Sequence, residues 1–218
     1  MNTISCIILN DNNRDIKKTL ESVTWCDEII VWTKPINGDW ARARNEAMTT
    51  AKNDWVLFID SDEILNEPIK INNNFDGFFI KRHDIFWNHE MRFGEAGKTK
   101  LLRLGKKSAG KWKRKVHEFW DIKNPGEIKE YLIHYPHPTI KDFIDQINSY
   151  TEIDAKELQT EGKKFSYFRL IFNPVGKFMQ NYFLKLGFLD GIQGFVYAFM
   201  MSFHSLVVRI KMHENHGL

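Results

Sequence analysis

Two aspartates separated by one residue, Asp60 and Asp62, are the strongest candidates in this chain for a ligand-binding or metal-binding site. They come directly after the apolar run Trp55–Ile59, which is typical of a central strand in a parallel sheet. Ligands of open α/β sheets bind beyond the carboxyl ends of the strands, so we expect both carboxylates to face a crevice there. Two such oxygen ligands suit Mg²⁺ or Mn²⁺, which would offset the charge of a diphosphate. The alternative is an acidic turn that only caps the next segment.

Glu118 is the candidate for a general base. It follows a predicted strand, and the neighbouring Phe119 and Trp120 are expected to exclude water and raise the pKa of the glutamate. His117 would orient Glu118 or complete a metal site. The alternative is a solvated glutamate at the end of a strand.

Strands and helices alternate over the first 65 residues, which predicts a parallel sheet with right-handed crossovers. Strands are expected at Thr3–Leu9, Glu28–Trp32 and Trp55–Ile59, and Ile16 and Asp39 begin the intervening helical patterns. Further strands are expected at Gly77–Lys81, Lys100–Leu104, Val116–Asp121 and Tyr131–His134. Because polar loops rather than helices separate these, we expect an antiparallel extension of the sheet.

The rest of the chain is expected to be helical and rich in aromatic residues. An amphipathic pattern runs from Ile140 to about Leu158, and Thr160–Lys164 is the best linker, so we predict one domain over 1–160 and an extension over 161–218. The uncharged stretch 192–208 is near the lower limit for crossing a bilayer. Aromatic residues with flanking cations suit a helix lying on an anionic membrane surface. A lid or dimer interface packed on protein is the alternative.

Composition excludes several classes of protein. With 218 residues, 43% hydrophobic and 27% charged, the chain is neither disordered nor fibrous. Two cysteines exclude a disulfide framework and a cysteine zinc site. Nine basic residues lie between 98 and 115, but no nucleic-acid-binding motif accompanies them, so we expect no nucleic acid partner. One of the nine, Arg103, lies inside an apolar strand and would hold a phosphate or carboxylate.

Several segments together resemble glycosyltransferase family 2, whose catalytic domain has the GT-A fold. They are Ile-Ser-Cys-Ile-Ile-Leu-Asn at 4–10, Glu-Ile-Ile-Val at 28–31, Ala-Arg-Asn-Glu-Ala at 43–47 and Asp-Trp-Val-Leu-Phe-Ile-Asp-Ser-Asp-Glu at 54–63. Leu-Leu-Arg-Leu at 101–104, Val-His-Glu at 116–118, the histidine at 134 and the aromatic tail are similar to its bacterial lipopolysaccharide-core glucosyltransferase branch. The resemblance implies a Rossmann-like, mainly parallel mixed sheet flanked by helices.

The resemblance also implies an inverting, metal-dependent transfer of a sugar from a nucleotide sugar, most simply a UDP-sugar. Asp60 and Asp62 would serve the diphosphate and its metal, with Asp62 as the direct ligand. Arg44 and Asn45 would lie near the donor, and Asp11 near the nucleotide base or ribose. The acceptor would be a saccharide or lipid-linked saccharide, and the enzyme would lie peripherally on the cytoplasmic face of the cell membrane.

His134 is expected to face the active site by its position in the family pattern.

The loop 32–38 departs from the family pattern. The family has an acidic residue and a Ser/Gly-rich segment there, whereas this chain has Trp32-Thr33-Lys34-Pro35. That change favours an alternative function, a non-catalytic module that binds carbohydrate or a membrane surface on a degenerate GT-A scaffold. A nucleotidyltransferase is the third hypothesis, and it should carry a glycine-rich, basic loop after the first strand, which Asn10–Asn13 does not provide.

Overall fold

The computed structural model describes residues 2–115 and 118–214, and these form two compact units. Unit 1 extends to His83 and resumes over Thr99–His134, and unit 2 comprises Asp84–Lys98 and the chain from Tyr135 onward. This division differs from the boundary expected at residue 160. The reason is that the helix that begins at residue 140 packs its apolar side against the last helix of the chain.

Unit 1 is built on a mixed sheet, as the sequence predicts. The strands are β1 (Ile4–Leu9), β2 (Glu28–Trp32), β3 (Trp55–Asp60), β4 (Glu63–Leu65), β5 (Gly77–Phe86), β7 (Lys100–Lys106) and β10 (Pro125–His134), in the order β2-β1-β3-β7-β5-β10-β4. β1 pairs in parallel with β2 and β3. β7 pairs antiparallel with both β3 and β5, and β4 pairs antiparallel with β10. The predicted parallel core and its antiparallel extension are therefore confirmed.

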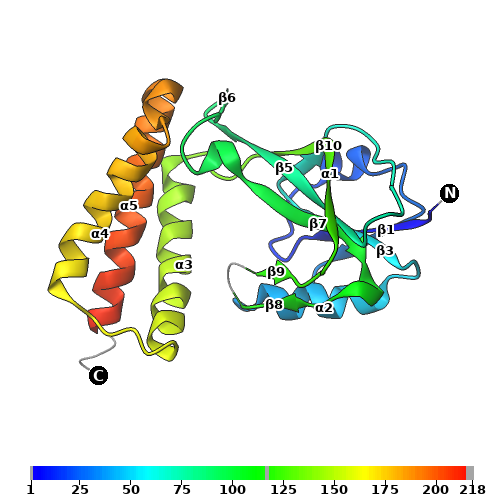
Figure 1. Ribbon diagram of the computed structural model, residues 1–218, viewed down its shortest axis with the longest axis horizontal. Coiled ribbons are helices and arrows are strands. Elements are labelled where there is room, and N and C mark those ends of the chain that lie inside the picture. The colour runs from blue at the N-terminus through cyan, green and yellow to red at the C-terminus, as the bar shows by residue number, and fades with distance from the viewer. Residues whose placement is uncertain (1, 116–117, 215–218) are drawn as a thin grey trace. The chain divides into compact units, whose positions relative to one another are not determined.

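The central strands alternate their side chains between two apolar cores. Ile8 and Leu57 belong to the core on the side of α1 (Lys17–Ser22), whereas Ile7 and Phe58 belong to the core on the side of α2 (Trp40–Thr50). The two helices accordingly lie on opposite faces of the sheet (Figure 1). Small residues on α2 allow the helix to approach the sheet closely, and the Asp39 carboxylate caps its first turn by accepting from the Arg42 N–H at 2.9 Å.

Three of the expected strands differ from the observed strands by more than two residues. β5 and β10 are each 10 residues long. Of the strand expected over Val116–Asp121, the structure shows only β9 (Phe119–Trp120), which pairs with β8 (Trp112–Lys113) in a separate two-stranded sheet. Residues 116 and 117 lie outside the described residues. The short strands β4, β6 (His89–Glu90) and β8 were not expected, because two or three residues carry no measurable period.

Unit 2 consists mainly of helices, as expected for the end of the chain. They are α3 (Ile140–Thr160), α4 (Tyr167–Met179), the π-helical turn η3 (Gln180–Leu184), the 3₁₀ turn η4 (Gly187–Asp190) and α5 (Gly191–Glu214). A capping box between Thr139 and Asp142 begins α3. The short 3₁₀ turn η1 (Ala96–Lys98) belongs to the same unit, whereas η2 (Lys107–Ala109) follows β7 in unit 1.

Candidate active site

The candidate site lies at the carboxyl ends of β1 and β3. Leu9 and Asp60 are paired at the ends of these two strands, and the Ser61 N–H donates to the Leu9 carbonyl oxygen at 3.1 Å. Asp60, Asp62 and the turn after β1 therefore lie at the same edge of the sheet, which is where open α/β sheets bind their ligands.

Asp60 is held by two buried arginines. Its Oδ1 accepts from Arg44 Nη2 at 2.8 Å, and its Oδ2 accepts from Arg103 Nη2 at 2.6 Å. Burial alone would raise the pKa of the Asp60 carboxyl, but the positive charges of Arg103 and Arg44 outweigh burial and hold the pKa well below its ordinary value. Asp60 is therefore a carboxylate whose two oxygens are already engaged by cations.

Arg44 connects Asp60 to the predicted base. The side chain is 1% exposed and extends from α2, with its guanidinium 4.8 Å from the Trp112 ring centroid and 5.4 Å from that of Phe58. Its Nε donates to Glu118 Oε1 at 3.1 Å. Asp60 and Glu118, 58 positions apart in the sequence, are thus joined through one guanidinium.

The surroundings of Glu118 differ from those expected. Trp120 is buried, but it stacks on Trp112 and meets the Phe58 ring edge to face, and Phe119 is 47% exposed. The close partner of the carboxylate is therefore the Arg44 cation. His117, proposed to orient Glu118, lies outside the described residues.

Both arginines also carry buried N–H groups with no hydrogen-bond partner among the described residues. These are Nη1 of Arg44 and both Nε and Nη1 of Arg103. An unpaired buried donor is costly, and each of these atoms is able to donate to an anionic oxygen. Arg103 thus has the character predicted for it, a fixed guanidinium inside the sheet.

A second buried carboxylate, Glu63, supports this cluster and was not singled out from the sequence. Its side chain is fully buried, and Oε2 accepts from the Asp60 N–H at 3.0 Å. Oε1 lies 3.8 Å from Nη2 of Arg103 and 3.8 Å from Nη1 of Arg82. Burial raises the pKa of Glu63, and the nearby charge of Asp60 raises it further. In the sequence, the one feature that could have indicated a role for Glu63 is its place in the acidic run 60–63.

Asp62 has more accessible surroundings than Asp60. Its side chain is 21% exposed, and Oδ2 pairs with Arg14 Nη1 at 2.8 Å, an arginine whose side chain is 45% exposed. Oδ1 lies 3.6 Å from Nε2 of His134. The structure therefore brings His134 beside the acidic pair. Arg14 was missed because the turn after β1 contains no periodic pattern that marks one polar residue over another.

The two aspartates differ in how well they fit a divalent cation. Both oxygens of Asp60 face guanidinium groups, so a cation bound there would meet two fixed positive charges and Asp60 does not fit as a direct ligand. Asp62 fits, because its partners among the described residues are an exposed arginine and an imidazole. Among the described residues no three His, Cys, Asp or Glu side chains gather into a complete set of ligands. One carboxylate is sufficient for Mg²⁺ when phosphate oxygens and waters complete the shell.

The remaining predicted residues lie near the cluster in different ways. Asp11 is half-buried in the turn after β1, two residues beyond Leu9. Asn45 uses both atoms of its amide on the Trp112 backbone, donating to the carbonyl oxygen at 2.9 Å and accepting from the N–H at 3.0 Å. Asn45 therefore anchors β8 to α2 through Trp112, the residue whose ring lies beside the Arg44 guanidinium.

Much of the basic run between 98 and 115 is neutralised by pairing. Lys100 binds Glu127, Lys106 binds Asp76 at 2.8 Å, and Lys113 binds Asp121. Lys107 donates to the Ala51 carbonyl oxygen at 2.7 Å. The run therefore stabilises the loops around β7 and β8 of unit 1.

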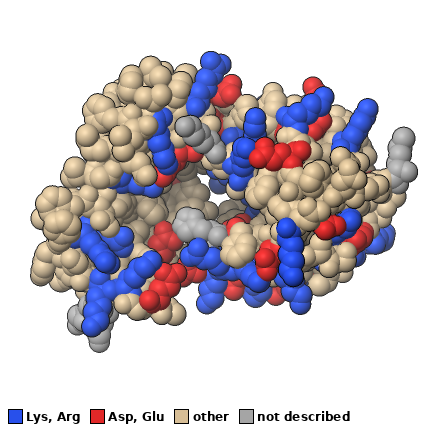
Figure 2. All heavy atoms as spheres, in the orientation of Figure 1, with Lys and Arg blue, Asp and Glu red and all other residues tan. Residues whose placement is uncertain are grey.

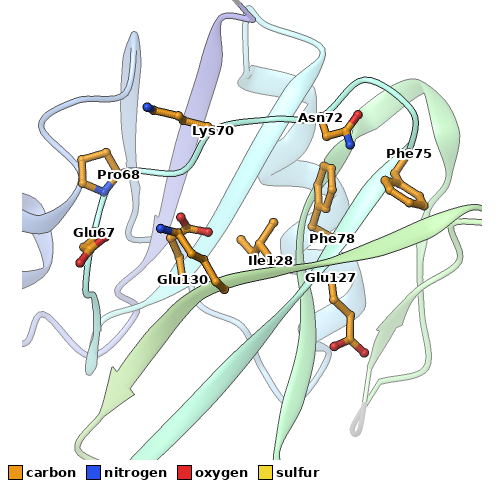
Figure 3. Close-up of a pocket in the computed structure, with 10 residues that line it drawn as sticks. Glu67, Pro68, Lys70, Asn72, Phe75, Phe78, Glu127, Ile128 and Glu130 are labelled. Carbon is orange, nitrogen blue, oxygen red and sulfur yellow. The ribbon is translucent and has the colours of Figure 1, made fainter.

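A pocket of about 420 Å³ lies elsewhere in unit 1 (Figure 3). Phe75, Phe78 and Ile128 form its apolar part, and Glu67 and Glu130 line its rim. Of the predicted site residues that the structure describes, none lines this pocket. The pocket is thus separate from the arginine-carboxylate cluster.

Comparison with known proteins shows which proteins this chain is similar to. Residues 2–95 match the sequence profile of Glycosyl transferase family 2. An uncharacterized glycosyltransferase of Rickettsia typhi is 27% identical over 227 residues, which cover 94% of this chain and 74% of the relative. The lipopolysaccharide core biosynthesis glycosyltransferase LpsC of Rhizobium meliloti is 22% identical, over 82% of this chain and 71% of LpsC.

Among solved structures, the crystal structure of S. aureus TarS shows a weak likeness, with 12% sequence identity and a TM-score of 0.42 over 95% of this chain and 55% of TarS. The matched segment 2–95 contains α2 with Arg44, β3 with Asp60, and the turn after β3 with Asp62. The part of the chain that is similar to Glycosyl transferase family 2 is therefore the part that contains these three residues.

Proposed function

We propose that this protein transfers a sugar, with inversion at the anomeric carbon, from a nucleotide sugar to a hydroxyl of a saccharide or lipid-linked saccharide. The similarity of residues 2–95 to Glycosyl transferase family 2 supports sugar transfer from a nucleotide-sugar donor. The name of the relative LpsC supports an acceptor of the lipopolysaccharide-core class. We take a UDP-sugar as the donor and the cytoplasmic face of the cell membrane as the site of action.

The observation that carries the proposal is the pair of buried arginines that bind Asp60, two residues before Asp62. Arg44 and Arg103 are fixed in place by Asp60, so their positions are set before a ligand arrives. Their positive charges are suited to the negative charge of a diphosphate. In this proposal Asp60 positions the arginines, and the arginines stabilise charge that develops on the leaving nucleotide diphosphate.

Asp62 would hold Mg²⁺ or Mn²⁺. When bound, such a cation offsets part of the negative charge of the diphosphate. Arg14 would move away from Asp62 to admit it, at small cost because an exposed ion pair contributes only about 0–1 kcal/mol. His134 beside Oδ1 would restrict the orientation of the Asp62 carboxylate.

Glu118 would act as the general base. Its carboxylate takes the proton of the acceptor hydroxyl while the hydroxyl oxygen attacks the anomeric carbon. The bond from that carbon to the diphosphate oxygen breaks on the opposite face, and the electron pair leaves with the nucleotide diphosphate. Because Arg44 contacts both Asp60 and Glu118, it would keep the base at a fixed distance from the leaving group.

The test is a screen of nucleotide sugars for hydrolysis and transfer, with and without Mn²⁺, on the full chain and on Asp62→Ala. We expect activity with one donor class, dependence on the metal, and loss of activity in Asp62→Ala with its thermal stability retained. Ser61→Ala, in the same turn, is the matched control and should remain active. Equal turnover in Asp62→Ala and the unsubstituted chain would overturn the assignment.

A non-catalytic module that binds carbohydrate or a membrane surface is the second candidate. The full occupation of both Asp60 oxygens by arginines favours it, as does the altered loop 32–38. Calorimetry with UDP and Mn²⁺ separates the two candidates. Metal-dependent heat supports the transferase, and its absence together with saccharide binding supports the module.

A further inference from the structure

The helix α4 carries its apolar residues on the outside of unit 2. Phe168, Ile171, Phe172, Val175 and Met179 recur at intervals of three and four residues and are each between 46% and 67% exposed. Such spacing places them along one side of the helix. The only buried residue of α4, all of which the structure describes, is Pro174. This is the reverse of a helix in a water-soluble domain, whose apolar side faces the core.

One polar side chain of α4, Lys177, is directed into the protein instead. Lys177 binds Glu95 at 2.6 Å, and Lys185, in the connection after α4, binds the same carboxylate at 3.2 Å. These half-buried ion pairs fix the rotation of α4 about its axis. The exposure of its apolar side is therefore a consequence of specific contacts.

α5 continues the same surface. Ile192, Phe195, Phe199 and Phe203 are exposed at the same helical spacing, and the connecting turns expose Leu184 at 79%. The two helices pack directly on each other, with Ser202 Oγ donating to the Pro174 carbonyl oxygen at 2.8 Å. We call these exposed residues of α4, α5 and the turns between them the apolar face. In Figure 2 the spheres over α4, at the left, are largely tan, with blue side chains at the lower end.

The charge of this segment identifies what covers the apolar face. Residues 161–214 contain seven Lys or Arg residues and three acidic residues, Glu161, Asp190 and Glu214. Four of the lysines are in ion pairs (Lys163, Lys177, Lys185 and Lys211), whereas Lys164, Arg169 and Arg209 form none among the described residues and leave this segment cationic. Asp190 is 3% exposed and accepts from the Arg92 and Phe93 N–H groups, so it is turned inward. A second copy of this face would bring two cationic surfaces together, which electrostatic repulsion opposes. Anionic lipid headgroups complement it.

Two of the cations lie close together. Burial lowers the pKa of Arg209, and the charge of nearby Arg169 lowers it further. Arg169 is exposed on α4, and Lys164 is exposed in the segment that leads to this helix. Neighbouring cations beside exposed aromatic rings are the arrangement by which an amphipathic helix lies within the headgroup layer.

Because α5 packs on α3, α5 does not cross a bilayer when unit 2 is folded in this way. The segment Gly187–Glu214 is long and apolar enough to cross a membrane, with 22% of its most apolar window buried. However, Met200 of α5 packs on Phe143 and Ile147 of α3. His204 of α5 lies 3.4 Å from Asp154 of α3. Crossing the bilayer would take the charged side of α3 into hydrocarbon, at a cost of about 2.5–3.5 kcal/mol or more for each charge.

We propose that the apolar face docks on the surface of an anionic lipid bilayer, with the rings at the level of the headgroups and Arg169 and Lys164 against lipid phosphates. This inference goes beyond sugar transfer, because binding to lipid requires neither donor nor acceptor. A bilayer also explains why both helices and the turns between them are apolar on the same side.

The test is partition of the full chain onto vesicles of phosphatidylcholine alone and of an equimolar mixture with phosphatidylglycerol. We expect binding to the mixed vesicles, weaker binding to the neutral ones, and weakening by salt. Phe168→Ser with Phe172→Ser should lower partition about tenfold or more. Both side chains are more than half exposed, so the fold should persist, as circular dichroism will check. Ile144→Ser, at an exposed apolar position of α3, is the matched control and should bind as before.

A second pair of substitutions separates the charge from the apolar contribution. Lys164→Gln with Arg169→Gln should remove most of the preference for the anionic vesicles and leave binding to neutral vesicles unchanged. Absence of binding to either vesicle would overturn the proposal. So would a stable dimer in solution that dissociates in the Phe168→Ser, Phe172→Ser variant, since the face would then be an interface between two copies.

Discussion

Asp60 and Asp62 should respond very differently to the same substitution. Asp60→Asn removes the charge that balances two guanidinium groups, whose side chains are 1% and 6% exposed. Asp62→Asn removes one partner of Arg14, whose side chain is 45% exposed. The two aspartates are separated by one residue, so a difference between the variants reports on their surroundings and not on the substitution.

The magnitudes follow from burial. Breaking a buried ion pair by removing one partner costs about 3–5 kcal/mol, because the other charge stays buried without compensation. In Asp60→Asn the new amide keeps one oxygen acceptor, so we expect a loss near the lower end, about 3 kcal/mol in the free energy of unfolding. Loss of an exposed pair costs about 0–1 kcal/mol. For a chain of this size, about 3 kcal/mol lowers the melting temperature by roughly 6–12 °C.

Tryptophan fluorescence during urea unfolding is the appropriate assay. Six of the seven tryptophans lie in unit 1, which contains Asp60, and only Trp87 lies in unit 2. The signal therefore follows the unit that is perturbed. Arg103→Met and the double variant with Asp60→Asn complete a thermodynamic cycle. The double variant should lose less than the sum of the single variants by about 1 kcal/mol or more, because the two residues contact each other.

Two outcomes would refute this reasoning. One is an Asp60→Asn variant that is no less stable than Asp62→Asn. The other is strict additivity in the cycle. Either result would mean that Asp60 is not the carboxylate that balances Arg44 and Arg103.

Three further predictions concern the same site. The pKa of Asp60 is lowered in the folded state, so the stabilisation that its carboxylate gives is complete above the ordinary pKa of about 3.9 and is lost as the pH falls through the folded pKa. The free energy of unfolding should therefore fall less steeply below about pH 4 in Asp60→Asn than in the unsubstituted chain. Identical pH profiles would contradict this. Asn45→Ala leaves the Trp112 backbone unpaired, so unfolding in urea should show a loss of about 1–3 kcal/mol, and no loss would count against the anchor. Glu118→Gln should lower transfer about a hundredfold or more with unchanged affinity for UDP in calorimetry, whereas full turnover would exclude it as the base.

The sheet was predictable because its strands carry local patterns. β1 and β3 are apolar on both faces, and parallel strands buried on both faces have this composition. The amphipathic spacing after Ile140 likewise predicted α3. The compact units were not predictable in the same way, because the packing of α3 on α5 joins segments about 50 residues apart.

The acidic pair was predictable from its position after a buried strand, but its partners were not. Arg44 is 16 positions from Asp60, and Arg103 is 43 positions away. No periodicity relates α2 and β7 to the turn after β3. The expectation of an apolar environment for Glu118 relied on its neighbours in sequence, whereas its close partner, Arg44, is 74 positions away.

The sequence by itself determined the order of the elements, the edge of the sheet where acidic residues gather, and the apolar, cationic composition of the last fifty residues. These properties depend on residues that are neighbours in the sequence and on the short repeat of apolar residues along a helix or a strand. The tertiary structure decided that Asp60 is bound by two arginines while Asp62 stays accessible, and that α4 exposes its apolar side. Both outcomes depend on which distant side chains share a buried volume, and the energy of burying a charge or an apolar surface is set only when the chain has folded.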